Sequence, residues 1–414
     1  MKLLIVIPKG LEMNILRKIG SNLPLQLITM ILVIFFAGDY IPLSVKEFFY
    51  TISVLIKDLL VLALPYIIFA YLFSTLVALQ NGAILFVITL VASVIFMNFL
   101  GLNIAYMVSH LLTELSGLSP VTTDPSRELM FMWKLPVPDF LKTILQNENG
   151  LVLGVLSGIG LGYLKVNGLN NISDRLKAGA SFILNKMFIP VVPFFILGFI
   201  LKMQHEGTLS YVLKQYGPVY LMIAAVQSLY LLALLGIGAK LNPTKWLAYL
   251  RNMIPPAITG ISTMSSAAAL PFSLKAAEAN TQNPLIARSV IPSTVNINLM
   301  GDSMGVPLMI LATMITFGLG IPSYELYLIF ALQYVMYMFT VAAVPGATII
   351  VMIPVVQEVF GFNGEMISLA TALYILYDAI GTTMNVMGNG VFVILYNRLF
   401  GKMFSGKMTK APAR

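Results

Sequence analysis

The chain has 414 residues, of which 58% are hydrophobic and 10% are charged, and its mean hydropathy is +0.89. A soluble domain carries about 25% charged residues, so this composition excludes a water-soluble globular protein and predicts a membrane protein. The absence of cysteine excludes disulfides and thiolate metal sites, and the net charge of +8 comes from Lys and Arg scattered over short loops, which indicates a membrane protein and no nucleic-acid partner.

Long apolar stretches predict about eight membrane spans, since a helix needs roughly 20 apolar residues to cross the hydrocarbon core. In chain order they occupy residues 24–37, 44–79, 83–113, 148–165, 178–203, 217–239, 283–319 and 367–399. Segment 114–147 is polar and rich in proline, and it is predicted to be an exposed loop. The predicted fold is an all-α integral membrane protein that crosses the lipid bilayer several times.

Two further segments, 252–275 and 323–359, each have apolar arms on either side of a turn of small residues. The first turn is Ser262-Thr-Met-Ser-Ser-Ala-Ala-Ala-Leu-Pro271, and the second is Ala342-Ala-Val-Pro-Gly-Ala-Thr348. Non-helical backbone is tolerated at membrane depth only where it is buried in protein or lines a cavity. The two segments are therefore predicted to be re-entrant helical hairpins.

One short motif occurs twice inside the apolar stretches. Asn298-Leu-Met-Gly301-Asp302 lies in the seventh stretch, and Asn385-Val-Met-Gly388-Asn389 lies in the eighth. Because each copy follows one hairpin and the hairpins open from opposite sides, the arrangement predicts an inverted repeat with two broken spans. Discontinuous spans in corresponding positions of two repeats indicate a transporter binding site between them.

The distribution of basic residues predicts the orientation of the chain in the membrane. Lys2, Lys9, Arg17 and Lys18 place the N-terminus in the cytoplasm, and most other Lys and Arg then fall on the same side, including those near the C-terminus. We expect a multi-pass protein of a bacterial-type plasma (inner) membrane with both termini cytoplasmic. The residues that do not fit this orientation are Arg127, Lys134, Lys142, Lys202 and Lys214.

These motifs resemble those of the dicarboxylate/amino acid:cation symporter (glutamate transporter) family. The turn Ser262–Pro271 resembles the serine-rich tip of the family's first hairpin, and Val344-Pro345-Gly346-Ala347 resembles the tip of its second hairpin. Residues Asn298–Asp302 stand where the family has Asn-Met-Asp-Gly-Thr. Residues Asp378–Asn389 resemble Asp-x-x-Arg-Thr-x-x-Asn-Val-x-Gly-Asp in its last span.

The resemblance implies a homotrimer that works by elevator-type alternating access, with the second hairpin as the outer gate. It also implies a small-molecule substrate, a coupling cation and no cofactor. The implied divisions are scaffold helices 1 and 2 in residues 1–82, transport-domain helix 3 in 83–113, the loop and scaffold helices 4 and 5 in 114–216, and the rest of the transport domain in 217–414.

A zwitterionic amino acid brings a carboxylate and an ammonium into a low dielectric, where each needs a partner. Ser266, the backbone N–H groups of the first hairpin and the Asn385 amide can donate to the carboxylate, while Asp378 and the Thr382 hydroxyl can accept from the ammonium. Asp378, Thr382 and Asn385 are spaced i, i+4 and i+7, which places them on one helical face. Ser266 could instead be a small residue that permits close packing. The other predicted substrate-binding residues are Ser265, Asp302, Val344, Pro345, Gly346 and Gly381.

The chain departs from the family where acidic substrates are recognised. Members that carry acidic substrates have an arginine in the last span or at the first hairpin tip, and those positions are Gly381 and Met264 here. Without a guanidinium, a second substrate carboxylate has no bidentate partner. Asp302 stands in place of a threonine near the substrate side chain and reverses the local charge. These changes predict a neutral or cationic amino acid as substrate, with an acidic amino acid or dicarboxylate as the alternative.

The ion sites also depart from the family, because its two ion-binding aspartates align with Met300 and Asn389. Each missing carboxylate removes a hard oxygen ligand and a countercharge. Coupling could use a reduced sodium site or a proton on Asp302 or Asp378, and a one-residue gap near Met300 would move Asp302 toward a missing ion ligand. The candidate sodium ligands are Asn296, Asn298, Asn385 and Asn389.

Three classes of function are compatible with such a chain, and secondary active transport is favoured. A channel-like, anion-conducting member of the same family is the second class. An intramembrane enzyme would need a Ser–His or paired-acid arrangement, but His110 and His205 lie at span ends far in sequence from Asp378. Since no Gly-rich phosphate loop is present either, we predict neither an enzyme nor an ATP-driven pump.

Overall fold

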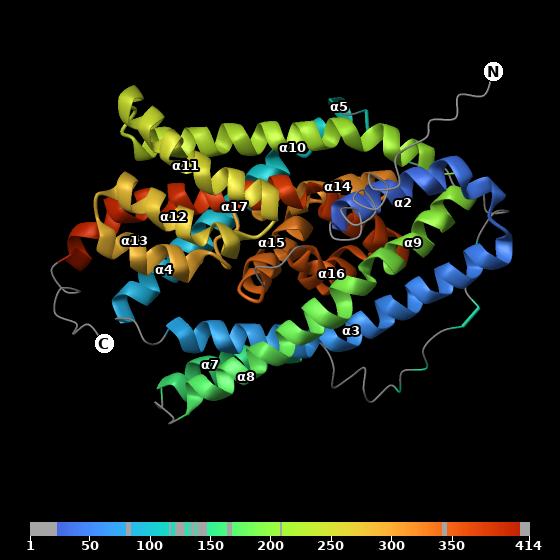
Figure 1. The fold of residues 1–414 in the computed structure, drawn as a ribbon, viewed down its shortest axis with the longest axis horizontal. Helices are drawn as coiled ribbons and strands as arrows, with labels where there is room; N and C mark the ends of the chain where they lie inside the picture. Colours follow the sequence, from blue (N-terminus) through green and yellow to red (C-terminus); the bar gives the residue numbers. More distant parts are fainter. Residues whose placement is uncertain are drawn as a thin grey trace, which may run out of the picture.

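The computed structural model describes residues 23–79, 84–115, 147–163, 168–207, 209–341 and 346–405, with a few isolated positions between 117 and 138 (Figure 1). These residues form helices and turns, and none of them lies in a strand. The helices are α2 (Leu23–Ala37), η1 (Gly38–Tyr40), α3 (Leu43–Leu79), α4 (Ile84–Met107), α5 (Leu111–Glu114), α7 (Asn147–Tyr163), α8 (Leu169–Phe182), the π-helical η3 (Ile183–Phe188), α9 (Ile189–His205), α10 (Leu209–Gly238), α11 (Pro243–Thr263), α12 (Ser266–Thr281), α13 (Pro284–Thr294), α14 (Asp302–Thr316), α15 (Tyr324–Met338), α16 (Ala347–Phe360) and α17 (Gly364–Ser405).

The prediction of an all-α protein is confirmed for the described residues, and each predicted apolar stretch lies on one or more helices. Three helical segments in the described part are long and apolar enough to cross a membrane: Leu85–Met107, Lys214–Gly238 and Gly364–Phe404. A bent pair, Leu169–Phe188 with Pro193–His205, would make a fourth span. The count of eight spans stays a prediction. The orientation stays a prediction too, because the described residues do not include most of the 114–147 loop or the basic residues Lys2, Lys9, Arg17 and Lys18.

The helices pack in two groups that meet along α9 and α17. Helix α3 packs along α7, α8 and α9; in Figure 1 α3, α7 and α8 lie along the lower edge of the molecule and α9 runs diagonally upward from them. Helices α11, α12, α13 and α17 pack on one another, while α4 and α10 pack against α14. Apolar side chains are buried between the helices, as expected for close-packed helix faces. The second group contains every described residue that the sequence predicts to bind substrate or sodium.

The first predicted hairpin is confirmed as two helices that meet at Met264 and Ser265. Met264 adopts a left-handed conformation (φ 49°) and its N–H donates to the Gly260 carbonyl, which ends α11. Ser265 then caps α12, because its Oγ accepts from the Ala268 N–H at 3.3 Å. The helical arms extend beyond the predicted segment, from residue 243 to residue 281.

The second predicted hairpin corresponds to α15 and α16, which pack against each other. Residues 342–345 lie outside the described residues, so the structure does not test the predicted positions of Val344 and Pro345. Gly346, with a φ of 79°, directly precedes α16 in a left-handed conformation that favours glycine.

The two copies of the repeated motif adopt different structures. The first break is confirmed, because α13 ends at Thr294 and α14 begins only at Asp302. The predicted second break is wrong, because α17 continues as one helix through Asn385 and Asn389. Glycine lowers helix stability by only about 1 kcal/mol, so a motif with Gly388 can remain helical when long helical segments flank it. Gly388 instead permits close contact, since a Cβ there would lie 2.6 Å from the Met300 Cβ.

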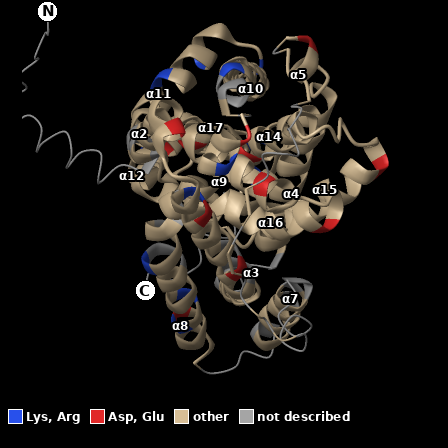
Figure 2. Ribbon diagram, turned by 90° about the vertical axis from the view of Figure 1, so that its right-hand side faces the viewer, with Lys and Arg blue, Asp and Glu red and all other residues tan. Residues whose placement is uncertain are grey.

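A buried ionic cluster joins α9 to the first turn of α17. Charged residues are sparse on the ribbon (Figure 2), yet Lys202 is only 3% exposed. Its Nζ lies 3.1 Å from Glu206 Oε1 and 2.8 Å from Glu365 Oε1, and 5.1 Å from the centre of the Tyr50 ring. The two carboxylates neutralise Lys202, one of the basic residues that do not fit the predicted orientation.

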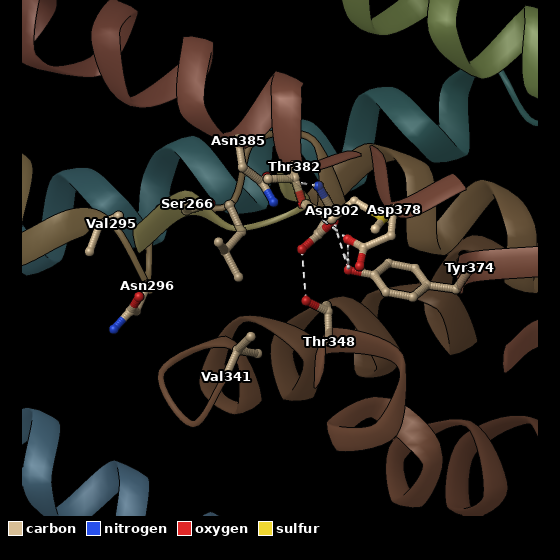
Figure 3. Close-up of a pocket in the computed structure, with 12 residues that line it drawn as sticks. Ser266, Val295, Asn296, Asp302, Val341, Thr348, Tyr374, Asp378, Thr382 and Asn385 are labelled. Atoms are coloured by element: carbon tan, nitrogen blue, oxygen red, sulfur yellow. Dashed lines mark hydrogen bonds between the residues drawn. The ribbon is translucent and has the colours of Figure 1, made fainter. Parts of the chain in front are cut away.

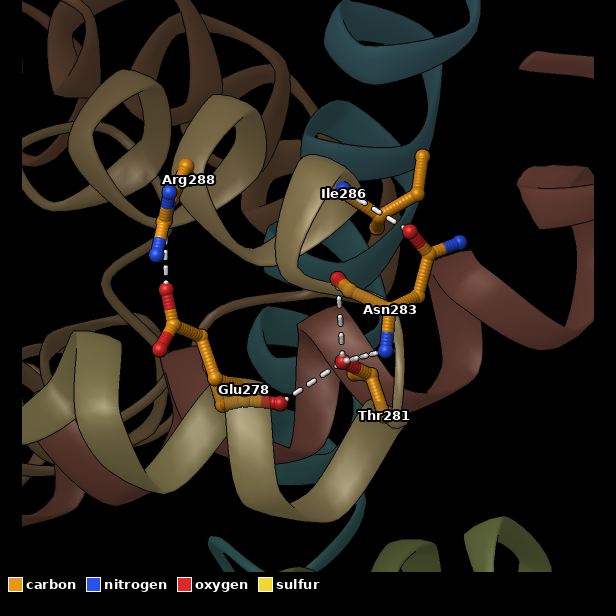
Figure 4. A network of polar contacts seen from close by, with 6 residues as sticks. Glu278, Thr281, Asn283, Ile286 and Arg288 are labelled. Carbon is orange, nitrogen blue, oxygen red and sulfur yellow. Dashed lines mark hydrogen bonds and ion pairs between the residues drawn. The ribbon is translucent and has the colours of Figure 1, made fainter. Parts of the chain in front are cut away.

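We predict that Lys202→Met lowers the free energy of unfolding by about 3 kcal/mol, because it leaves Glu206 buried without a cation. The exposed pair of Arg288 and Glu278 supplies the control (Figure 4), since the Arg288 side chain is 68% exposed. Arg288→Met is expected to cost less than about 1 kcal/mol. Thermal unfolding of both variants in the same detergent measures the difference, and equal losses would contradict the prediction.

Candidate functional site

A small pocket lies where the start of α12, the broken span and the starts of α14 and α16 meet the middle of α17 (Figure 3). Its volume of about 20 Å³ has room for about one water molecule. Among the described residues that line it, two have acidic side chains and none has a basic one. The lining residues are Met264, Ser266, Val295, Asn296, Leu299, Asp302, Val341, Thr348, Tyr374, Asp378, Thr382 and Asn385.

Asp302 is the first residue of α14, and its side chain faces this pocket. It is 2% exposed, and its carboxylate accepts from the Thr348 hydroxyl at 2.7 Å and from the Tyr374 hydroxyl at 3.2 Å. Its carbonyl accepts from the Tyr334 hydroxyl at 2.9 Å. These contacts hold the carboxylate against α16 and α17, as Figure 3 shows. Met300, in contrast, lies against Gly388 on α17.

Asp378 lies on α17 and is 4% exposed. One carboxylate oxygen accepts from the Gly346 N–H at 3.1 Å, and the other accepts from the Thr382 hydroxyl at 3.0 Å. The Tyr374 hydroxyl lies 3.5 Å from Asp378 Oδ1, so one phenol contacts both buried carboxylates. The structure thus brings Asp302, Gly346, Asp378 and Thr382 together, as the sequence predicts.

Asn385 has a structural task that the sequence reasoning missed. Its Oδ1 accepts from the Gly301 N–H at 2.8 Å and from the Asp302 N–H at 3.1 Å. The amide therefore satisfies the first backbone donors of α14, which have no partner within that helix. Its Nδ2 group is also engaged, because the Asn385 side chain hydrogen-bonds the Asp302 carboxylate, and the predicted contact with a substrate carboxylate would have to replace that bond.

Two glycines allow the broken span to lie directly on α17. A Cβ at Gly301 would lie 2.3 Å from the Gly381 carbonyl oxygen, and a Cβ at Gly381 would lie 2.5 Å from Tyr377 Cε1 and 3.1 Å from Asp302 Oδ1. The Gly301 carbonyl accepts from Gln227 Nε2 at 2.7 Å and from the Tyr377 hydroxyl at 3.2 Å. No side chain fits at Gly381 without displacing Tyr377 or Asp302, so an arginine is sterically excluded there.

The candidate sodium ligands lie beside the pocket. Asn298 Nδ2 donates to Asn389 Oδ1 at 3.1 Å, while the Oδ1 atoms of Asn296 and Asn298 are buried and have no hydrogen-bond partner among the described residues. Asn98, which the sequence reasoning missed, fixes this segment by donating to the Ile297 carbonyl at 2.7 Å. Among the described residues no group of three or more His, Asp or Glu could hold a metal, so a cation site here would consist of amide and backbone oxygens. Such hard oxygen ligands suit sodium.

Ser265 and Ser266 take different positions at the first hairpin. Ser265 is occupied as the cap of α12, whereas Ser266 is buried and lines the pocket. Tyr374 and Thr348 line it too but were missed by the sequence reasoning. Tyr374 precedes Asp378 by one helical turn, and that spacing is a signal that could have identified it.

The fold and the pocket define a helical membrane protein with a buried, acidic small-molecule site. Residues 23–399 match the sequence model of the sodium:dicarboxylate symporter family, and the chain belongs to this family. The family consists of symporters and not of enzymes, and its name is consistent with sodium as the coupling ion.

One curated relative is similar to this chain. It is a Caenorhabditis elegans protein named as the sodium-dependent excitatory amino acid transporter glt-4, and it is 25% identical over 295 residues. The alignment covers 69% of this chain and 58% of the relative, so the chain matches little more than half of that protein.

We predict that Gly301→Ala lowers the free energy of unfolding by about 2 kcal/mol, because the new methyl group would overlap the Gly381 carbonyl. Gly160→Ala on α7 is the matched control, since a Cβ there meets nothing within 4 Å. The control is expected to keep or slightly raise the melting temperature. A melting temperature for Gly301→Ala equal to the wild type would show that the two backbones are not in such close contact.

Proposed function

We propose that this chain is a secondary active symporter for a small neutral or cationic amino acid. Membership of a symporter family supports transport, and the pocket supports the substrate class. The observation that carries the proposal is the pair of buried carboxylates, Asp302 and Asp378, in a pocket without a basic side chain. Ionisable residues buried at membrane depth are costly and are usually retained for substrate or ion binding.

Recognition of an amino acid uses both ends of this pocket. Asp378 accepts from the substrate ammonium, while Ser266, the N-terminal N–H groups of α12 and the Asn385 Nδ2 group donate to its carboxylate. A second carboxylate on the substrate would lie near Asp302 with no guanidinium to pair with, because Gly381 and Met264 occupy the arginine positions. The electrostatic repulsion disfavours glutamate, aspartate and dicarboxylates.

Coupling uses a cation that enters with the substrate. The unpartnered oxygens of Asn296 and Asn298, with backbone carbonyls of the broken span, support a reduced sodium site. Met300 and Asn389 supply no negative charge there, so sodium is held more weakly than by an aspartate. A proton on Asp302 or Asp378 is the alternative coupling ion.

Alternating access follows the elevator scheme of the family, in a homotrimer in a bacterial-type plasma membrane. Residues 83–113 and 217–414 form the transport domain, and residues 1–82 and 114–216 form the scaffold. The packing of α3 with α7, α8 and α9 supports this division, since all four helices lie within residues 1–82 and 114–216.

Uptake by purified protein in liposomes tests the substrate and the coupling. We expect neutral or basic amino acids to be concentrated in preference to acidic ones. We also expect Asp378→Asn to abolish uptake, because the substrate ammonium loses its charged partner.

Higher uptake of acidic amino acids would overturn the substrate assignment. Current without concentrative uptake would indicate a channel. Uptake that ignores sodium replacement but stops with a protonophore would identify the proton as the coupling ion.

Asn389→Asp tests the reduced sodium site by restoring a charge. The variant keeps the oxygen that accepts from Asn298, so we expect a several-fold lower sodium concentration for half-maximal uptake. Asn397→Asp is the control, because Asn397 lies on the same helix and its Oδ1 accepts from Asn283 in the same way. Equal sodium dependence in both variants and the wild type would argue against a sodium site beside Asn389.

A further inference from the structure

The pocket holds more negative charge than an ordinary amino acid can balance. Asp302 and Asp378 are both nearly inaccessible, and no Lys, Arg or His lines the pocket. A buried carboxylate is costly unless a cation compensates it. A neutral amino acid carries no net charge, so together with the proposed coupling cation it leaves one of the two carboxylates uncompensated, whereas an amino acid with a second ammonium compensates both.

Of the three side chains that hydrogen-bond the Asp302 carboxylate, Thr348, Tyr374 and Asn385, the first two are exchangeable. Thr348 and Tyr374 contact its carboxylate through hydroxyl groups, which rotate freely and can accept as well as donate. Neither hydroxyl carries a charge. An ammonium group that reaches Asp302 would replace them with a charge-assisted bond, which is stronger than a neutral one.

The two carboxylates are close enough together for one short molecule to contact both once the pocket opens beyond its volume of about 20 Å³. A single Tyr374 oxygen lies 3.2 Å from Asp302 Oδ1 and 3.5 Å from Asp378 Oδ1, and Figure 3 shows both side chains converging on it. The pocket cannot extend past Gly381, because the Tyr377 ring fills the space that a Cβ would occupy. Two ammonium groups separated by a few methylene groups therefore fit the short distance between the two carboxylates. Two ammonium groups at the ends of a longer chain fit it less well.

We propose that the pocket selects short diamino acids, of the class of diaminopropionate, diaminobutyrate and ornithine. The α-ammonium binds Asp378, the side-chain ammonium binds Asp302, and the carboxylate binds the first hairpin. This assignment rests on the proposed transport function and makes Asp302 the residue that determines specificity. Lysine and arginine bind less tightly, since their cationic groups lie farther from the α-carbon.

Thermal stabilisation of the purified wild-type protein by matched amino acids tests the proposal. Diaminobutyrate and norvaline have the same shape, but a methyl group in norvaline replaces the side-chain ammonium. We expect diaminobutyrate to bind at least tenfold more tightly than norvaline, and more tightly than lysine. In Asp302→Asn the preference over norvaline should disappear. Glu278→Gln, which neutralises an exposed carboxylate on α12, should leave the preference unchanged.

Equal binding of norvaline and diaminobutyrate to the wild type would overturn the diamino-acid assignment, and norvaline uptake in liposomes would then show that the transport function still holds. Binding and uptake of no amino acid would overturn both. If Asp302→Asn fails to fold, the wild-type comparison of the isosteric pair decides the proposal alone. A preference for diaminobutyrate that survives in a folded Asp302→Asn variant would reject Asp302 as its cause.

Discussion

The site depends on one amide oxygen that holds a broken helix against a continuous one. Asn385 Oδ1 accepts from two successive backbone N–H groups, those of Gly301 and Asp302, where α14 begins. Within a bilayer, backbone groups released by a helix break must find partners in the protein. Asn385 supplies them from α17, and Gln227 and Tyr377 bind the Gly301 carbonyl from the other side. The position of Asp302 follows directly, because it is the residue that Asn385 caps.

Gly381 determines which charged side chain this site can hold. Gly381 leaves room for the Asp302 carboxylate, and Tyr377 fills the remaining space beside it. An arginine at position 381 and an aspartate at position 302 would compete for the same volume. In this packing a carboxylate at position 302 and a guanidinium at position 381 therefore exclude each other.

Much of the fold and part of the site could be predicted from local chemistry. The tip at Met264–Ser265, the break after Thr294 and the helical face shared by Asp378, Thr382 and Asn385 all come from short-range patterns. The continuity of α17 could not be predicted, because Asn385–Asn389 follows the same pattern as Asn298–Asp302, with Asn, Met and Gly at the same three positions. Which copy unwinds depends on tertiary contacts, since one copy supplies the cap and the other receives it. Thr348 was missed because its role depends on Asp302, which is distant in sequence.

The ionic cluster of Lys202, Glu206 and Glu365 determines which ion pairs break when α17 moves relative to α9. Lys202 has one carboxylate partner on its own helix, Glu206 at i+4, and a second on another helix, Glu365. Loss of the second partner leaves the ammonium still neutralised by the first. Separation of the two helices therefore breaks the ion pair with Glu365 but leaves the Lys202 ammonium paired with Glu206.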